Sequence, residues 1–77
     1  MPPLVDPLKL LSVLHSLSAV DERRAVSLDF LSKVLGISVR ELEEPLRVLH
    51  DMNYVILKGA RVYLSELGIL KISSTYC

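Results

Sequence analysis

The sequence predicts a small, mostly helical α+β domain, with a three-helix core, a β-hairpin and a short C-terminal helix. Three observations support this fold class. Apolar residues recur at helical spacing in the first two thirds of the chain. Gly36 separates two of the helical segments by only a tight turn. Two strand-like segments flank Gly59. A length of 77 residues favours a single domain, here residues 1–77.

The first helix is expected from Asp6-Pro7 to about Ala19, after an extended lead-in over Met1–Val5. Aspartate caps helices well, and proline suits the first helical position. The apolar residues of this helix are Leu8, Leu10, Leu11, Val13, Leu14 and Leu17. They cover more than the single stripe of an isolated surface helix. The helix is therefore either clasped on two sides or part of a subunit contact, and His15 is expected to be partly buried with one partner.

A charged loop over Val20–Val26 follows, with a short strand at Ala25-Val26. The second helix is expected over about Leu28–Leu35. Ser27 can cap its start, and Gly36 can end it in the left-handed conformation.

The third helix opens with a capping box between Ser38 and Glu41 and runs to about Met52, where Asn53 can take the left-handed exit. Pro45 lies inside this segment and cannot donate a hydrogen bond to the Glu41 carbonyl. Either the helix kinks near Glu41, or its regular part starts around Pro45.

Two strands, Tyr54–Leu57 and Arg61–Leu64, are expected around a two-residue turn at Gly59-Ala60. This register places four aliphatic side chains on one face, namely Val55, Leu57, Val62 and Leu64. The other face carries Tyr54, Ile56, Lys58, Arg61 and Tyr63. A final helix is expected over about Glu66–Ser73.

The most informative segment runs from Leu31 to Leu49. Two helices that cross steeply need a small residue at their contact, here Ser32, and a glycine in the turn, here Gly36. This part of the chain resembles winged helix-turn-helix transcription regulators of bacteria and archaea, in the residues LSKVLGIS, LRVLHDMNYV and VYLSELGIL. The resemblance covers about residues 26–70.

The resemblance implies a binding module for double-stranded DNA. In that family the third helix enters the major groove and the hairpin acts as a wing against the neighbouring DNA. The DNA-facing residues that it implies are Val39, Arg40, Glu43, Glu44, Arg47 and His50 on the third helix, with Lys58 and Arg61 at the wing tip. The sequence departs from the family at Glu43-Glu44 and at Pro45. Two arginines against four acidic residues give Val39–Met52 a net charge of −2.

Ordinary structural roles remain open for the same charged residues. Arg40–Glu44, Glu43–Arg47 and Arg47–Asp51 have i,i+4 spacing, so a self-neutralised solvent face is the alternative to a recognition surface. The basic residues around the hairpin turn are either wing contacts or solubilising charges on an exposed edge.

Composition bears on the partner. Nine basic residues balance nine acidic ones, whereas stand-alone nucleic-acid binders are usually basic. Hydrophobic residues make up 51% of the chain, more than one small core can hide, which favours a homodimer or a protein partner through the first and the C-terminal helix. The alternative function is therefore a protein-interaction or scaffold module that does not bind DNA.

No catalytic, metal or cofactor site is predicted, so the chain is not expected to be an enzyme. The three glycines are isolated, and two histidines and one cysteine lack zinc-ligand spacing. Cys77 has no internal disulfide partner, which fits a reducing compartment. No apolar run reaches the ~18 residues of a membrane span, so a cytoplasmic protein is expected.

Overall fold

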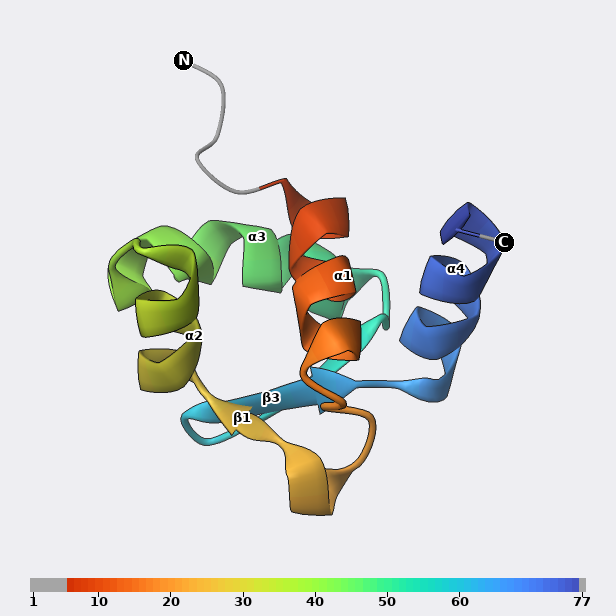
Figure 1. Ribbon diagram of the computed structural model, residues 1–77, viewed down its shortest axis with the longest axis horizontal. Helices are drawn as coiled ribbons and strands as arrows, with labels where there is room; N and C mark the ends of the chain where they lie inside the picture. The colour runs from red at the N-terminus through yellow and green to blue at the C-terminus, as the bar shows by residue number, and fades with distance from the viewer. Residues whose placement is uncertain (1–5, 77) are drawn as a thin grey trace.

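The computed structural model describes residues 6–76, in which helices lie over one face of a small antiparallel sheet (Figure 1). The elements are α1 (Pro7–Ser16), a 3-10 turn η1 (Glu22–Arg24), β1 (Val26–Ser27), α2 (Leu28–Leu35), α3 (Val39–Asp51), β2 (Val55–Lys58), β3 (Arg61–Leu64) and α4 (Glu66–Tyr76). The prediction of a mostly helical α+β fold with a small sheet is confirmed.

The helix α1 lies in the middle of the helical layer, between α3 and α4, and also contacts β3 (Figure 1). Its residues Leu10, Leu11 and Leu14 have no solvent exposure, which confirms that the helix is clasped on two sides. The expectation for His15 is wrong: its side chain is exposed, because it lies on a side of α1 that its neighbours leave uncovered.

Three helices end at a residue with a left-handed backbone. These residues are Ser18 (φ 59°), Gly36 (φ 70°) and Asn53 (φ 63°). After α1, the Ala19 N–H donates to the Leu14 carbonyl at 3.0 Å, which closes the helix in a Schellman motif. The predicted helix end at Ala19 is therefore wrong, since α1 stops at Ser16. The expected left-handed exits at Gly36 and Asn53 are confirmed.

The sheet has the order β1-β3-β2, with β3 in the centre. Val55 pairs with Leu64 and Leu57 with Val62 around a two-residue turn, as predicted. The first two strands begin one residue later than predicted, at Val26 and Val55. Tyr54 consequently lies outside β2. Its half-buried side chain packs against the core.

Pro45 lies within α3, which is assigned as one helix from Val39 to Asp51. The alternative that the regular helix starts around Pro45 is therefore wrong. The proline ring is buried on the same side of the helix as Leu46 and Leu49. Burial of an apolar ring offsets part of the cost of the lost backbone hydrogen bond.

The helix α4 continues to Tyr76, three residues beyond the predicted Ser73. Ser65 caps its start by accepting a hydrogen bond from the Gly68 N–H at 3.0 Å. Gly68 lies directly against the backbone of Tyr54: a Cβ atom at this position would overlap the Tyr54 carbonyl oxygen and lie 2.9 Å from its carbon. The absence of a side chain thus allows α4 to dock beside the start of the hairpin.

Gly68→Ala tests this docking. Helix propensity alone predicts a gain of about 1 kcal/mol. We expect instead that the free energy of unfolding falls by about 2 kcal/mol, because the new methyl group meets backbone that cannot rotate away. Urea unfolding followed by circular dichroism measures the change. Ser73→Ala, at an exposed position of the same helix, is the control. A Gly68→Ala variant as stable as the wild type would contradict the close approach.

Candidate nucleic-acid interface

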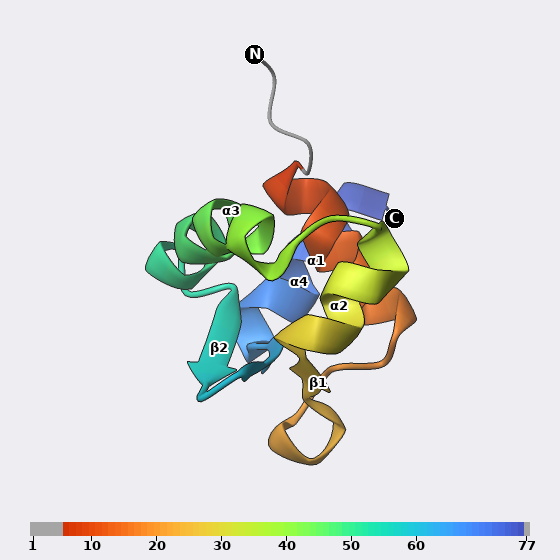
Figure 2. The same cartoon turned by 90° about the vertical axis from the view of Figure 1, so that its left-hand side faces the viewer.

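Figure 2 shows the turn that joins α2 to α3. Hydrogen bonds hold this turn from both sides. The Ser32 hydroxyl donates to the Ile37 carbonyl, and the Ile37 N–H donates to the Ser32 carbonyl at 3.2 Å. At the start of α3, the Ser38 hydroxyl accepts from the Glu41 N–H at 3.2 Å, while the Glu41 carboxylate accepts from the Ser38 N–H at 3.1 Å. The predicted capping box is confirmed. Together these bonds fix the direction in which α3 leaves α2.

One face of α3 is buried and the opposite face carries charge. The buried residues of α3 are Leu42, Pro45, Leu46 and Leu49. Opposite them, at spacing i, i+4, i+7 and i+11, lie Arg40, Glu44, Arg47 and Asp51, which we call the outer stripe. All four of its residues are exposed. Of the other predicted DNA-facing residues, Glu43 and His50 are exposed beside the stripe, whereas Val39 is half-buried.

The i,i+4 ion pairs of the alternative interpretation are not within contact distance along α3. Lys58 and Glu22 form an ion pair, whereas neither Arg40 nor Arg47 has a carboxylate of residues 6–76 within ion-pair distance. Arg40 and Arg47 therefore extend into solvent without a carboxylate partner. The physical reason is that an exposed pair gains little Coulomb energy in water and must immobilise two long side chains. The charges of the outer stripe sum to zero, but no ion pair forms within it. The N–H groups of each arginine therefore remain free to donate hydrogen bonds to a ligand.

The two basic residues of the hairpin differ in their surroundings. The Lys58 ammonium group donates to the Glu22 carboxylate of η1, and this hydrogen bond and charge raise the pKa of Lys58. Asp21 fixes η1 by accepting a hydrogen bond from the Arg24 N–H at 2.9 Å. Arg61, by contrast, is exposed and belongs to no ion pair of the described chain. Sequence reasoning missed Glu22, because its proximity to the hairpin depends on the packing of η1 against β3.

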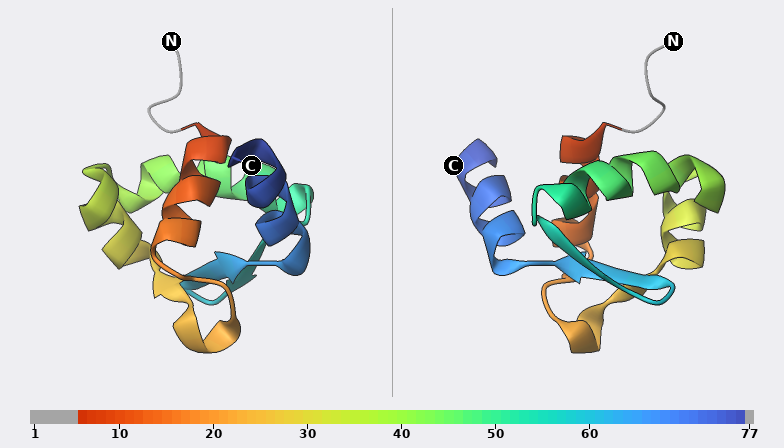
Figure 3. Two further views of the ribbon diagram at one scale, coloured as in Figure 1. Left: turned by 45° about the vertical axis from the view of Figure 1, so that its right-hand side comes forward. Right: turned by 180° about the vertical axis from the view of Figure 1, so that it is seen from behind.

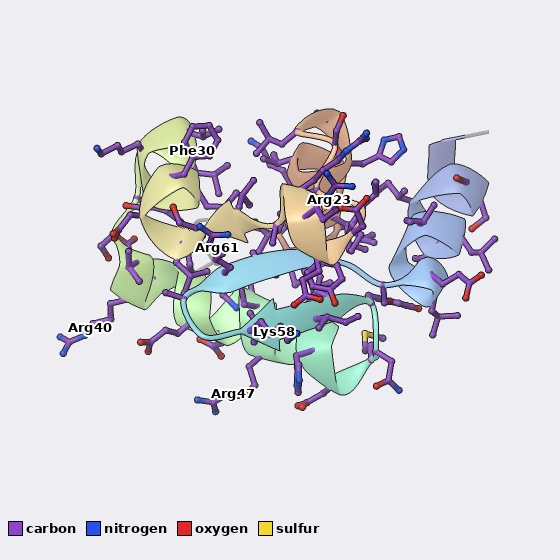
Figure 4. The ribbon with its side chains drawn as sticks, turned by 90° about the horizontal axis from the view of Figure 1, so that it is seen from below. Arg23, Phe30, Arg40, Arg47, Lys58 and Arg61 are labelled. Atoms are coloured by element: carbon purple, nitrogen blue, oxygen red, sulfur yellow. The ribbon has the colours of Figure 1, made fainter. Side chains whose placement is uncertain are left out.

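The basic candidate residues come from two neighbouring elements, α3 and the hairpin. Seen from behind, α3 and β2 lie next to each other across the same surface (Figure 3, right). From below, Arg40 and Arg47 extend outward from α3 at the same edge, with Lys58 over the hairpin and Arg61 toward α2 (Figure 4). Two elements that contact each other, α3 and the hairpin, thus both carry exposed basic groups.

Residues 6–76 contain neither a metal-binding cluster nor a helix that could span a membrane. No group of three histidine, cysteine or acidic side chains in residues 6–76 could hold a metal ion. None of the helices described there combines the length and the apolar character needed to cross a bilayer. Cys77 lies outside the described residues.

The Lys58–Glu22 pair predicts a pH effect. Because the pKa of Lys58 is raised in the folded protein, the pair stabilises the fold at neutral pH, and its contribution disappears as the pH rises through that pKa. We expect Glu22→Gln to bring the pKa of Lys58 back toward the ordinary lysine value, as measured by NMR titration of its Cε resonances. Asp29→Asn, a charge change on α2, is the control. An identical Lys58 titration in wild type and Glu22→Gln would contradict the pair.

Comparisons with protein-family models, with curated protein sequences and with solved structures found no match to this chain.

Proposed function

We propose that residues 6–76 form a winged helix-turn-helix domain that binds double-stranded DNA in transcriptional control. In this proposal α3 enters the major groove and the β2–β3 hairpin is the wing. The order of elements supports it, because a helix, a short strand, two helices joined by a tight turn and a hairpin follow one another along the chain. The hydrogen-bonded turn between α2 and α3 also supports it, since a recognition helix must project at a fixed angle.

The observation that carries the proposal is the position of Arg40 and Arg47 on the exposed face of α3, opposite its buried leucines. Arg40 and Arg47 are exposed, lie on one face of α3 and have no carboxylate within ion-pair distance. Arginine donates two parallel hydrogen bonds to phosphates or to guanine edges, so these side chains are suited to DNA. Arg61 supplies an exposed guanidinium from the hairpin. Exposed basic groups on both α3 and the hairpin match the two contacts of a winged helix.

The charge balance sets the expected strength of binding. The net charge is zero, and Glu22 already engages Lys58. Few phosphates can therefore be neutralised, and non-specific affinity should be modest, because counterion release supplies most of it. Binding should be readily observed only at low ionic strength.

Salt-dependent DNA binding tests the proposal. We expect a fluorescently labelled duplex to show an anisotropy increase at micromolar protein and low salt, with affinity falling as salt increases. Arg40→Ala, Arg47→Ala or Arg61→Ala should each reduce the slope of log affinity against log salt by up to about 1, because one fewer phosphate is neutralised. Lys9→Ala removes an exposed charge from α1 and is the control. Absence of duplex binding under these conditions would refute the proposal.

A protein-interaction module is the second candidate function, and the exposed side of α4 favours it. Leu67 and Leu70 lie one helical turn apart on α4 and are 48% and 62% exposed. Leu8 of α1, the neighbouring helix, is also more than a third exposed. The sequence predicted that the first and the C-terminal helix contact a partner. Both helices, α1 and α4, carry exposed apolar side chains that are not part of the core. A second copy of the chain or another protein would cover them.

Light scattering after size exclusion separates the possibilities for α4. If this helix mediates self-association, the wild type should elute as a dimer and Leu70→Lys as a monomer, because a charge would be buried in the contact. Since Leu70 is largely exposed, the substitution should leave the monomer folded. Val34→Lys, at a 47% exposed apolar position of α2, should remain dimeric. A wild-type monomer at all concentrations would rule out self-association through α4.

A further inference from the structure

The outer stripe of α3 alternates in charge along its length. Arg40 and Arg47 are the positive residues, and Glu44 and Asp51 follow them in turn. None of the four is engaged in an ion pair of the described chain. The entire helix from Val39 to Asp51 contains no asparagine or glutamine. The hydrogen-bonding groups that its outer stripe offers are therefore guanidinium donors and carboxylate acceptors.

These groups match the major-groove edge of a G·C pair. Arginine donates two hydrogen bonds to guanine O6 and N7, and a glutamate accepts from the cytosine N4 amino group. Adenine is read most often by the side-chain amide of asparagine or glutamine, which α3 lacks. Cytosine is the one base with a donor and no acceptor on its major-groove edge, so a carboxylate meets no repulsion there.

The spacing along α3 fits consecutive base pairs. Glu44 and Arg47 are three residues apart, about 4.5 Å along a helix axis. Arg40 and Arg47 are seven residues apart, about 10.5 Å. Base pairs of B-DNA are about 3.4 Å apart, so these separations correspond to roughly one and three base steps. Side chains of this length adjust for the remaining difference.

A carboxylate between two arginines acts differently from a third basic residue. It is repelled by every phosphate and by the acceptors of guanine, thymine and adenine, so it weakens binding to most sequences. It contributes favourably only where an amino group faces it. Glu44 would thus lower non-specific affinity while it raises discrimination between sequences.

We infer that the outer stripe selects a G·C-containing site, with Arg40 and Arg47 on guanines and Glu44 on a cytosine. This inference rests on the proposed function, since it requires α3 to lie in the major groove. Glu44 is assigned as a specificity-determining residue. Glu43 flanks the stripe, carries the same charge and provides a matched comparison.

Selection from a duplex pool with a randomised centre tests the inference. We expect the wild type to enrich sequences with G·C pairs at defined positions, preferred over A·T by at least about fivefold. Glu44→Gln should bind the unselected pool more tightly than the wild type and lose the preference for cytosine at one position. Glu43→Gln removes the same charge and should also bind the pool more tightly, but it should keep the cytosine preference. Equal loss of preference in both variants would overturn the assignment to Glu44.

A chemical change in the DNA provides a second readout. Replacing guanine by 7-deazaguanine in the selected duplex removes the N7 acceptor and leaves the phosphates unchanged. When the guanine opposite Arg47 is replaced, we expect wild-type binding to weaken by about fivefold or more. The same replacement should have little effect on DNA binding by Arg47→Ala, which already lacks the contacting side chain. Duplex binding without any base preference would overturn the inference and leave the proposed function standing. Absence of duplex binding would remove both.

Discussion

The direction of α3 depends on the hydrogen bonds that tie Ser32 to Ile37 across the turn from α2. A glycine alone would permit this turn, but it would also permit others, because glycine adopts several backbone conformations at similar energy. The Ser32 hydroxyl selects one geometry by satisfying the Ile37 carbonyl. On the other side of α3, Leu42 and Leu49 are buried in the same core as the leucines of α1. The helix is thus fixed at its start by hydrogen bonds and along its length by packing.

This arrangement separates two sets of side chains with different physical requirements. The apolar face of α3 must stay out of water, and its burial orients the opposite face outward without any contribution from the charged residues. The outer stripe therefore stabilises the fold little and is free to vary in chemistry. Arg40 and Arg47 can remain unpaired because the stability of the fold does not depend on their charge. In addition, an ion pair with a nearby exposed carboxylate would contribute little free energy.

Local signals in the sequence predicted much of the fold. The capping residues Ser27 and Ser38, the exit at Gly36 and the register of the hairpin depend on nearest neighbours, and all were correct. The end of α1 was missed, because Ser18 adopts a left-handed conformation that serine seldom takes. Side-chain pairing was left open by the sequence. The i,i+4 pairs of α3 do not form, and the pair that does form joins Lys58 to a residue 36 positions away.

Under the proposed function, the zero net charge and the exposed leucines of α4 are related, because a domain that binds DNA weakly benefits from dimerisation. A neutral domain gains little from the diffuse field of DNA, and one α3 helix contacts only a few base pairs. Its affinity for a single site must be low. In a dimer, once one copy of the domain has bound DNA, the second copy binds its half-site intramolecularly. The dimer therefore binds DNA more tightly than one domain does, although the contacts of each domain with DNA are unchanged. Association through Leu67 and Leu70 would supply that link, and a weakly charged recognition helix then restricts occupancy to places where two half-sites are correctly spaced.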